Sequence, residues 1–251
     1  FVQELEEVPD GATVIFSAHG VSPAVRVEAA GRELSVIDAT CPLVAKVHTE
    51  VRRFTRQGYQ VVLIGHPGHD EVEATRGEDP GIAVVDDPAQ VAELEVDDPE
   101  RVAYVTQTTL APADVEDVLS ALRGRFPDLA GPAASDICYA THNRQEGVRG
   151  LAPECDLILV VGSANSSNSN RLAEVARRCG CRAELLDDES GLDLAWLAGA
   201  TRVGVTAGAS APEALVQSLV RALGGLGPVT VEERAAPAER VSFSLPLEVR
   251  S

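Results

Sequence analysis

Methionine is absent from all 251 positions of the sequence, including the first, which is Phe1. Translation of an ordinary open reading frame begins with Met, so Phe1 cannot be a translated start. We therefore expect the sequence to be a fragment that lacks an N-terminal portion of its protein.

Long hydrophobic runs are also absent. The longest, such as Leu157–Val161, fall far short of the roughly 20 residues that span a bilayer, and no basic stretch followed by an apolar one opens the sequence. The 5 cysteines are an odd number and, without such a leader, do not form the disulfide framework of a secreted protein. We predict no membrane partner and a cytoplasmic location.

Basic residues are scarce: 21 Lys and Arg stand against 39 Asp and Glu, which gives a net charge of -18. A field of that sign repels a phosphate backbone, so nucleic acid is excluded as a partner. Because 45% of the residues are hydrophobic, the chain can bury a substantial core and falls in the range of one large domain or roughly two to three small ones.

Short β-branched runs recur along the chain, each closed by a small or polar turn and followed by a helical stretch. This alternation is typical of βα units with mainly parallel sheets, so we predict an α/β fold. For the last predicted helix, Ser210 is expected to be the N-cap and Glu213 to complete a capping box. The predicted strands are Thr13–Phe16, Leu34–Ile37, Gln60–Ile64, Ala83–Val85, Val102–Thr106, Leu157–Val161, Ala183–Leu186 and Arg202–Thr206, and the predicted helices are Val44–Arg56, Ala113–Phe126, Asn170–Arg178 and Pro212–Leu223.

Two changes in composition indicate where the chain divides. Pro127–Ser135 is rich in proline, glycine and small residues and is predicted to be a linker. The tail, Val231–Ser251, is predicted to be extended and partly strand-like.

Polar side chains gather where the predicted strands end. In an open parallel sheet, ligands bind at the carboxyl ends of the strands, where backbone amides point outward. A single Ser or Asn there is more often an ordinary turn or cap residue, but several such ends together predict a binding site. Since neutral donors prevail and Lys and Arg are nearly absent, we predict a small anionic ligand such as a phosphate or diphosphate. The segments concerned are Ser17–Gly20, Asp38–Pro42, Gly65–Glu71, Thr106–Thr109, Gly162–Asn168 and Thr206–Ser210.

The cysteines fall into two groups. Cys41 and Cys138 lie in turn-like contexts, and their surroundings alone leave open whether they are ligands or core residues. Cys155, Cys179 and Cys181 lie beside helix ends or apolar positions and are interpreted as core residues, with a redox or metal pair as the alternative for the last two.

Seven segments, taken in order, resemble the hydroxymethylbutenyl diphosphate reductases of the LytB type, and the resemblance covers nearly the whole chain. It implies three small α/β modules with mainly parallel sheets around a central cleft, in a trefoil-like arrangement whose first module is incomplete. The implied modules are 1–41 with the tail 225–251, then 42–135 and 136–224. The seven segments are Phe16–Ser22, Asp38–Val44, Gly65–Glu73, Thr106–Leu110, Ile137–Thr141 with Asn143–Gln145, Gly162–Arg171 and Thr206–Pro212.

The same resemblance implies the chemistry. Members of the family remove the allylic hydroxyl of 4-hydroxy-3-methylbut-2-enyl diphosphate with two electrons and two protons, giving isopentenyl and dimethylallyl diphosphate in the non-mevalonate pathway of isoprenoid biosynthesis. The implied cofactor is a [4Fe-4S] cluster held by three cysteines, with one iron open to the substrate hydroxyl. The implied electron donor is a ferredoxin or a flavodoxin.

Residue roles follow from the matching positions. Cys41 and Cys138 correspond to two cluster ligands, while the third cysteine and a further diphosphate-binding histidine belong to an N-terminal segment absent from this chain. Glu71 would be the proton source, and Thr108 would orient the substrate hydroxyl. The residues that would bind the diphosphate are His19, His69, Thr108, Ser166, Ser167, Asn168 and Ser210.

Each of these roles has a purely structural alternative. Glu71 is also suited to the first turn of a helix, Thr108 to a strand end, and Ser210 to a helix cap. His142 stands where the family has a hydroxyl residue, and its role is open.

With one cysteine missing, the fragment is expected to be inactive, and a non-catalytic phosphate-binding module or degenerate paralogue is the competing hypothesis. A serine hydrolase using Ser210 is disfavoured, because Gly208–Pro212 lacks the glycine that a nucleophile elbow places two residues after the serine.

Overall fold

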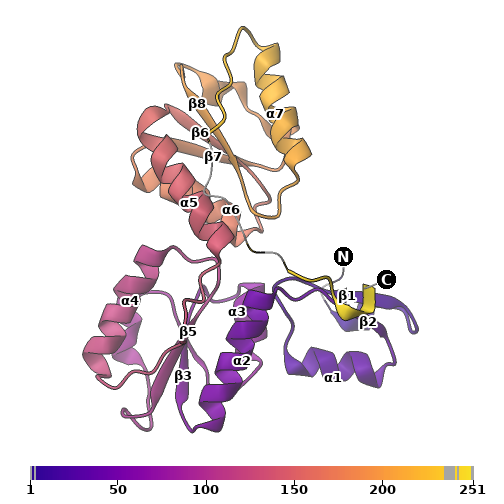
Figure 1. Ribbon diagram of the computed structural model, residues 1–251, viewed down its shortest axis with the longest axis vertical. Helices are drawn as coiled ribbons and strands as arrows, with labels where there is room; N and C mark the ends of the chain where they lie inside the picture. Colours follow the sequence, from indigo (N-terminus) through magenta and orange to yellow (C-terminus); the bar gives the residue numbers. More distant parts are fainter. Residues whose placement is uncertain (1, 3, 235–240, 242, 250–251) are drawn as a thin grey trace. The chain divides into compact units, whose positions relative to one another are not determined.

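The computed structural model describes residues 2, 4–234, 241 and 243–249 (Figure 1). The chain divides into two compact units. The first comprises Phe1–Thr108, Pro112–Ile137 and Val241–Ser251, and the second comprises Thr109–Ala111 and Cys138–Arg240. Three small sheets, all parallel in the described residues, make the fold α/β as predicted. The module boundaries drawn from the sequence stay a prediction.

The first unit begins with a sheet of two parallel strands, β1 (Thr13–Phe16) and β2 (Ser35–Asp38). They are joined by helix α1 (Pro23–Gly31), whose N-cap Ser22 accepts the N–H of Val25. A small apolar core fills the space between the sheet and this helix. Its buried members are Leu5, Val8, Phe16, Ala29 and Leu34.

The second sheet of the first unit has the order β4-β3-β5, formed by β4 (Ala83–Val85), β3 (Gln60–Ile64) and β5 (Val102–Thr106). Val61–Ile64 are all buried, as expected for a central parallel strand covered on both faces. The accompanying helices are α2 (Pro42–Arg56), α3 (Asp70–Arg76) and α4 (Pro112–Arg125).

The segment after α4 lies along the free edge of β5. The Tyr104 N–H donates to the Ala130 carbonyl at 3.0 Å, and the Ala130 N–H donates to the Val102 carbonyl at 2.9 Å. Further along, Asp136 Oδ2 accepts the Thr106 N–H at 3.1 Å. The predicted linker Pro127–Ser135 therefore extends the second sheet at its edge.

The second unit contains a sheet of order β7-β6-β8, formed by β7 (Arg182–Leu186), β6 (Leu157–Val161) and β8 (Val203–Ala207). Every residue of β6 is buried. Alternate side chains of β6 point to opposite faces, so Ile158 and Val160 pack with helices α5 (Tyr139–Leu151) and α6 (Ser167–Arg178). The other face packs with helix α7 (Glu213–Gly225) through Leu219, as Figure 1 shows.

Short 3-10 helices complete the described structure. None of the helices in the described part of the chain combines the length and the apolar character that crossing a bilayer requires. The 3-10 helices are Leu5–Glu7, Pro88–Glu93, Ala152–Glu154, Glu189–Gly191, Leu194–Leu197 and Leu247–Val249.

The prediction for the start of α7 was wrong. The helix begins at Glu213, its N-cap is Pro212, and no side-chain cap is formed there in the described residues. Ser210 as N-cap would require Ala211 to be helical, but a residue that precedes proline is kept out of the helical region by the proline ring. The described residues of the tail, 231–234, 241 and 243–249, contain a 3-10 helix and no strand, so the strand-like part of that prediction is not found in them; the remainder lies outside the described residues.

Candidate active site

Glu71 and Thr108 form a buried polar pair at the carboxyl end of the second sheet. Glu71 lies in the first turn of α3, and its Oε1 accepts the Thr108 N–H at 2.6 Å while its Oε2 accepts the Thr108 hydroxyl at 2.9 Å. Glu71 is only 2% exposed. Burial raises the pKa of Glu71 to about 7, because the lost hydration of the ionised form outweighs the hydrogen bonds from Thr108. Near neutral pH this carboxyl can therefore hold or release a proton.

Two imidazoles lie together in the same unit. The ring centroids of His19 and His69 are 5.4 Å apart in an edge-to-face arrangement, and His19 Nδ1 lies 3.7 Å from Asp70 Oδ2. His69 is the N-cap of α3, and its Nδ1 accepts the Glu71 N–H at 3.2 Å. Accepting at Nδ1 places the proton of the neutral ring on Nε2, which becomes a donor. Burial, followed by the neighbouring His19, lowers the pKa of His69, so the neutral form prevails at pH 7.

Cys41 and Cys138 are the N-cap residues of α2 and α5. Both thiols are free and partly exposed, and within the described residues neither is used to cap its helix. Cysteine binds a metal as its thiolate, and cysteine thiolates hold iron–sulfur clusters, so the two free side chains suit iron ligation. Burial raises the pKa of the Cys155 thiol and of the Cys181 thiol, which disfavours the thiolate that a metal binds.

The two candidate ligands lie in different units, Cys41 in the first and Cys138 in the second. In the described part of the chain, no three or more His, Cys, Asp or Glu side chains are grouped so that they could hold a metal ion. The fit to a cluster therefore depends on the chemistry of these two free thiols at helix N-cap positions.

In the second unit, the start of α6 presents polar groups at the carboxyl end of β6. Ser166 is the N-cap, and its hydroxyl accepts the Ser169 N–H at 3.3 Å. Ser167 Oγ lies 2.9 Å from Thr109 Oγ1. Asn168 is 7% exposed, and neither its amide nitrogen nor its amide oxygen has a hydrogen-bond partner among the described residues. Since buried amides are normally paired, this side chain indicates a polar ligand.

Two glycines allow the neighbouring loops to approach α6. A Cβ built on Gly162 or on Gly208 would lie 2.1 Å from Ser169 Oγ, far inside the contact distance of two heavy atoms. The loops after β6 and β8 can therefore meet the first turn of α6 only where no side chain intervenes. This close approach leaves the amino end of α6 framed by backbone, as in anion-binding sites.

The structure brings together predicted residues within each unit. In the first unit His19 faces His69, and Glu71 binds Thr108. In the second, the start of α6 carries three of the predicted residues: Ser166, Ser167 and Asn168. Ser210 is exposed in the turn before α7, and His142 is exposed on α5.

Two residues of this region were given no individual role from the sequence. Thr109 contacts Ser167. The feature of the sequence that could have indicated its role is the pair of threonines after β5. The Asp136 side chain is fully buried and lies 2.9 Å from Lys46 Nζ; burial raises the pKa of Asp136, and Lys46 opposes that effect. In the sequence, Asp136 is marked only as a single acidic residue two positions before Cys138.

Comparisons with known proteins agree on one family. The family model described as LytB protein matches residues 1–224. The 4-hydroxy-3-methylbut-2-enyl diphosphate reductases of Pseudomonas fluorescens and Xanthomonas campestris are 54% and 57% identical to the chain, over 100% of it and 81% of their own length. The solved structure of the E-1-hydroxy-2-methyl-but-2-enyl-4-diphosphate reductase from Plasmodium falciparum is similar with a TM-score of 0.91 at 36% identity, covering 98% of this chain and 78% of that one.

Proposed function

The chain belongs to the LytB family of 4-hydroxy-3-methylbut-2-enyl diphosphate reductases, oxidoreductases of isoprenoid biosynthesis, and on that premise we propose which of its residues carry the reaction. The proposed reaction breaks the C–O bond of the allylic hydroxyl. Two electrons and one proton form a new C–H bond on the allylic fragment, and the second proton leaves with the hydroxyl as water. The electrons come from a small carrier of the ferredoxin or flavodoxin class.

Glu71 is the proposed proton source, and its pairing with Thr108 is the observation that carries the proposal. With a pKa of about 7, a large share of the carboxyl is protonated at the pH of the cell, as a general acid requires. The Thr108 hydroxyl is 2.9 Å from Glu71 Oε2. It can accept the proton from the acid and donate its own toward a substrate hydroxyl, which it also orients.

The proposed diphosphate ligands are neutral donors. In the first unit the Nε2–H of His69 and the ring of His19 can each donate to a phosphate oxygen. In the second unit, the unpaired amide of Asn168 and the amino end of α6 suit an anion. The remaining proposed ligands are hydroxyls: Thr108, Ser166, Ser167 and Ser210.

We propose that Cys41 and Cys138, at the N-cap positions of α2 and α5, hold an iron–sulfur cluster as thiolates. A [4Fe-4S] cluster in this position would supply single electrons and an iron with an open coordination site that binds the substrate hydroxyl. Cys155 and Cys181 are not assigned to it, because their raised thiol pKa values disfavour the thiolate. A cytoplasmic location, where such thiols stay reduced, belongs to the same proposal.

Anaerobic reconstitution of the full gene product with iron and sulfide tests this function. Iron and sulfide are counted per chain, and reduction of the hydroxylated diphosphate is assayed. We expect Cys41→Ser and Cys138→Ser each to lose both the cluster and turnover, while Cys179→Ser, which alters an exposed thiol, keeps both. Absence of any cluster in the unmodified protein would contradict the reductase assignment and leave a phosphate-binding module as the explanation of the polar strand ends.

A further inference from the structure

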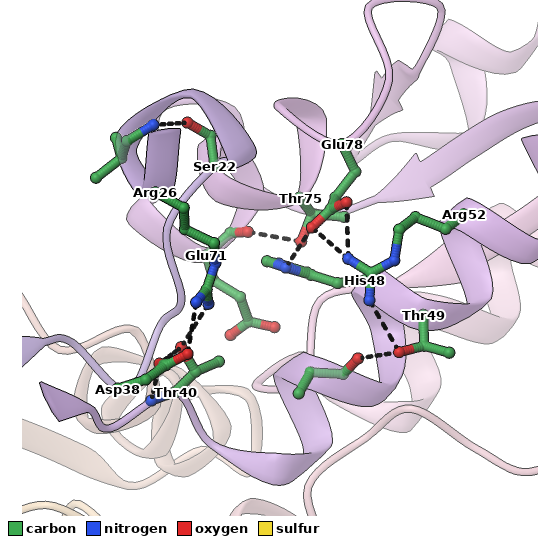
Figure 2. A network of polar contacts seen from close by, with 12 residues as sticks. Ser22, Arg26, Asp38, Thr40, His48, Thr49, Arg52, Glu71, Thr75 and Glu78 are labelled. Carbon is green, nitrogen blue, oxygen red and sulfur yellow. Dashed lines mark hydrogen bonds and ion pairs between the residues drawn. The ribbon is translucent and has the colours of Figure 1, made fainter. Parts of the chain in front are cut away.

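His48 lies in a polar network with Glu78 and Arg52 that the proposed reaction does not use (Figure 2). The residue lies on α2, is 3% exposed, and its Nδ1 is 2.9 Å from Glu78 Oε1. The Glu78 side chain is also only 3% exposed. Arg52, one turn further along α2, donates to both oxygens of Glu78 at 2.9 Å. The negative charge of the Glu78 carboxylate is therefore already neutralised by Arg52.

The His48 ring is neutral in this setting. Burial lowers its pKa, and the positive charges of Arg52 and Arg26 lower it further, while Glu78 opposes them. With Nδ1–H donating to Glu78, Nε2 is a bare acceptor that has no partner among the described residues. Protonation would leave a buried N–H unpaired, which is costly. The ring thus has one tautomer and one orientation.

One edge of this ring lies beside the turn that carries His19. A Cβ built on Gly20 would lie 3.1 Å from His48 Cε1, and Gly20 has a φ of +81° that favours glycine. The turn closes with the Gly20 N–H donating to the Ser17 carbonyl at 3.0 Å. Its Ala18 carbonyl accepts the Cys41 N–H, also at 3.0 Å. The Ser17–Gly20 turn therefore lies beside His48 and is bonded to Cys41, the N-cap residue of α2.

The other side of the network holds α3. Glu78 follows that helix, and its N–H donates to the Thr75 carbonyl at 3.1 Å. The Thr75 hydroxyl in turn donates to the Glu71 carbonyl at 2.8 Å. The bond from His48 to Glu78, together with those from Arg52, consequently ties the carboxyl end of α3 to α2, while Glu71 and the N-cap His69 occupy the other end of the same short helix.

We propose that His48 is a positioning residue of the active site, which fixes the Ser17–Gly20 turn, the start of α2 and helix α3 in one geometry. Through these three segments it sets the places of His19, Cys41 and Glu71. The inference rests on the proposed function for its catalytic meaning, whereas the geometry it describes exists without ligand. A histidine that only fills the core would stabilise the fold and leave these segments unchanged when it is replaced at equal stability.

Hydrogen exchange of the ligand-free protein tests the geometry directly. His48→Leu keeps apolar bulk but removes the donor to Glu78, and His48→Asn places an amide N–H near the former Nδ1. Val51→Ala is the matched control, since Val51 is fully buried on the same helix. We expect His48→Leu to speed exchange of the Gly20, Cys41 and Glu71 amides by about tenfold or more, with the Asn variant close to wild type. The amides of β6 in the second unit serve as the internal reference.

Binding of inorganic diphosphate and steady-state kinetics test the consequence. For His48→Leu we expect the Kd of inorganic diphosphate and the KM of substrate to rise about tenfold, since small displacements of positioning groups have large effects. His48→Asn should recover most of this, and Val51→Ala, compared at matched Tm, should change neither. If His48→Leu matches Val51→Ala in both exchange and affinity, His48 is a core residue and the inference is wrong. If wild type binds no diphosphate, the proposed function fails, while the exchange data still decide the role of His48.

Discussion

Glu71 illustrates how much a single buried carboxyl can couple stability to pH. Its pKa in the folded chain is about 7, against 4.5 for an ordinary Glu. The folded state therefore holds this proton more tightly than the unfolded state. The proton bound by Glu71 contributes fully to the free energy of unfolding below the unfolded pKa. This contribution declines as pH rises from 4.5 to 7 and is lost above that window, a change of about 3 kcal/mol.

Glu71→Gln should abolish that dependence, because the amide does not titrate. We expect the free energy of unfolding of the variant, relative to wild type, to rise by up to about 3 kcal/mol between pH 5 and pH 8. Urea unfolding at several pH values measures it. Glu73→Gln alters an exposed carboxylate on the same helix and is the control, for which the difference should stay constant. A Glu71→Gln difference that does not vary with pH would show that the carboxyl titrates normally.

Position 162 requires glycine because Ser169 leaves no room for a side chain there. A Cβ there would lie 2.1 Å from Ser169 Oγ, so Gly162→Ala should push the first turn of α6 aside and cost about 1–3 kcal/mol. Gly147→Ala is the contrasting variant, because its Cβ meets nothing within 4 Å in the described structure. In the middle of α5 it should stabilise by about 0.5–1 kcal/mol. Thermal unfolding of the two variants should thus shift in opposite directions, and a stabilised Gly162→Ala would refute the steric argument.

Among the elements, the edge of β5 is bonded both by the Ala130 backbone and by the side chain of Asp136, which forms an ion pair with Lys46. Asp136 accepts the Thr106 N–H and lies 2.9 Å from Lys46 Nζ on α2. Asp136→Asn keeps the shape but leaves Lys46 without its counter-charge, so we expect a loss of about 1–3 kcal/mol in the free energy of unfolding. Asp128→Asn, in the same segment but exposed, should stay within about 0.5 kcal/mol. Equal losses in the two variants would contradict the role assigned to Asp136.

The elements that were predictable from the sequence are those with a local signal. Strands β3 and β6 are buried runs of branched apolar residues, and their predicted bounds are confirmed. Helix α3 was missed because it has only 7 residues, too few for a helical period to show. Helix α5 was missed because most of its residues are polar, and two of the three side chains in its buried stripe of Thr141, Gln145 and Val148 are polar as well.

The residues of the candidate site also differ in whether the sequence carries a local signal for them. Glu71, Thr108 and His69 lie in segments that directly follow strands, where position in a parallel sheet predicts ligand contact, and their individual roles were implied by the resemblance to the family. His48 and Asp136 were not assigned a role, since each matters through a partner 30 residues away along the chain: Glu78 for the first and Thr106 for the second. Such pairings form only when the helices and strands pack together, and no spacing rule in the sequence predicts them.

On the scale of the whole molecule, each compact unit has its own apolar core and its own set of polar strand ends. The candidate acid–base pair and the two histidines belong to the first unit, and the asparagine with the serines at α6 belongs to the second. Each unit thus supplies part of the proposed chemistry, and both must be folded for turnover. Local damage to either core should lower activity in proportion to the folded fraction.

The net charge of -18 has its clearest consequence for electron delivery. A strongly acidic donor of the ferredoxin or flavodoxin class would be repelled at long range, and salt weakens this repulsion as the Debye length falls from about 30 Å at 0.01 M to about 8 Å at 0.15 M. We therefore expect the second-order rate of reduction by an acidic donor to increase over this range of NaCl. A small cationic reductant such as a viologen radical should show the opposite trend with the same protein. If the acidic donor also slows with salt, a basic surface near the site must steer its docking despite the overall charge.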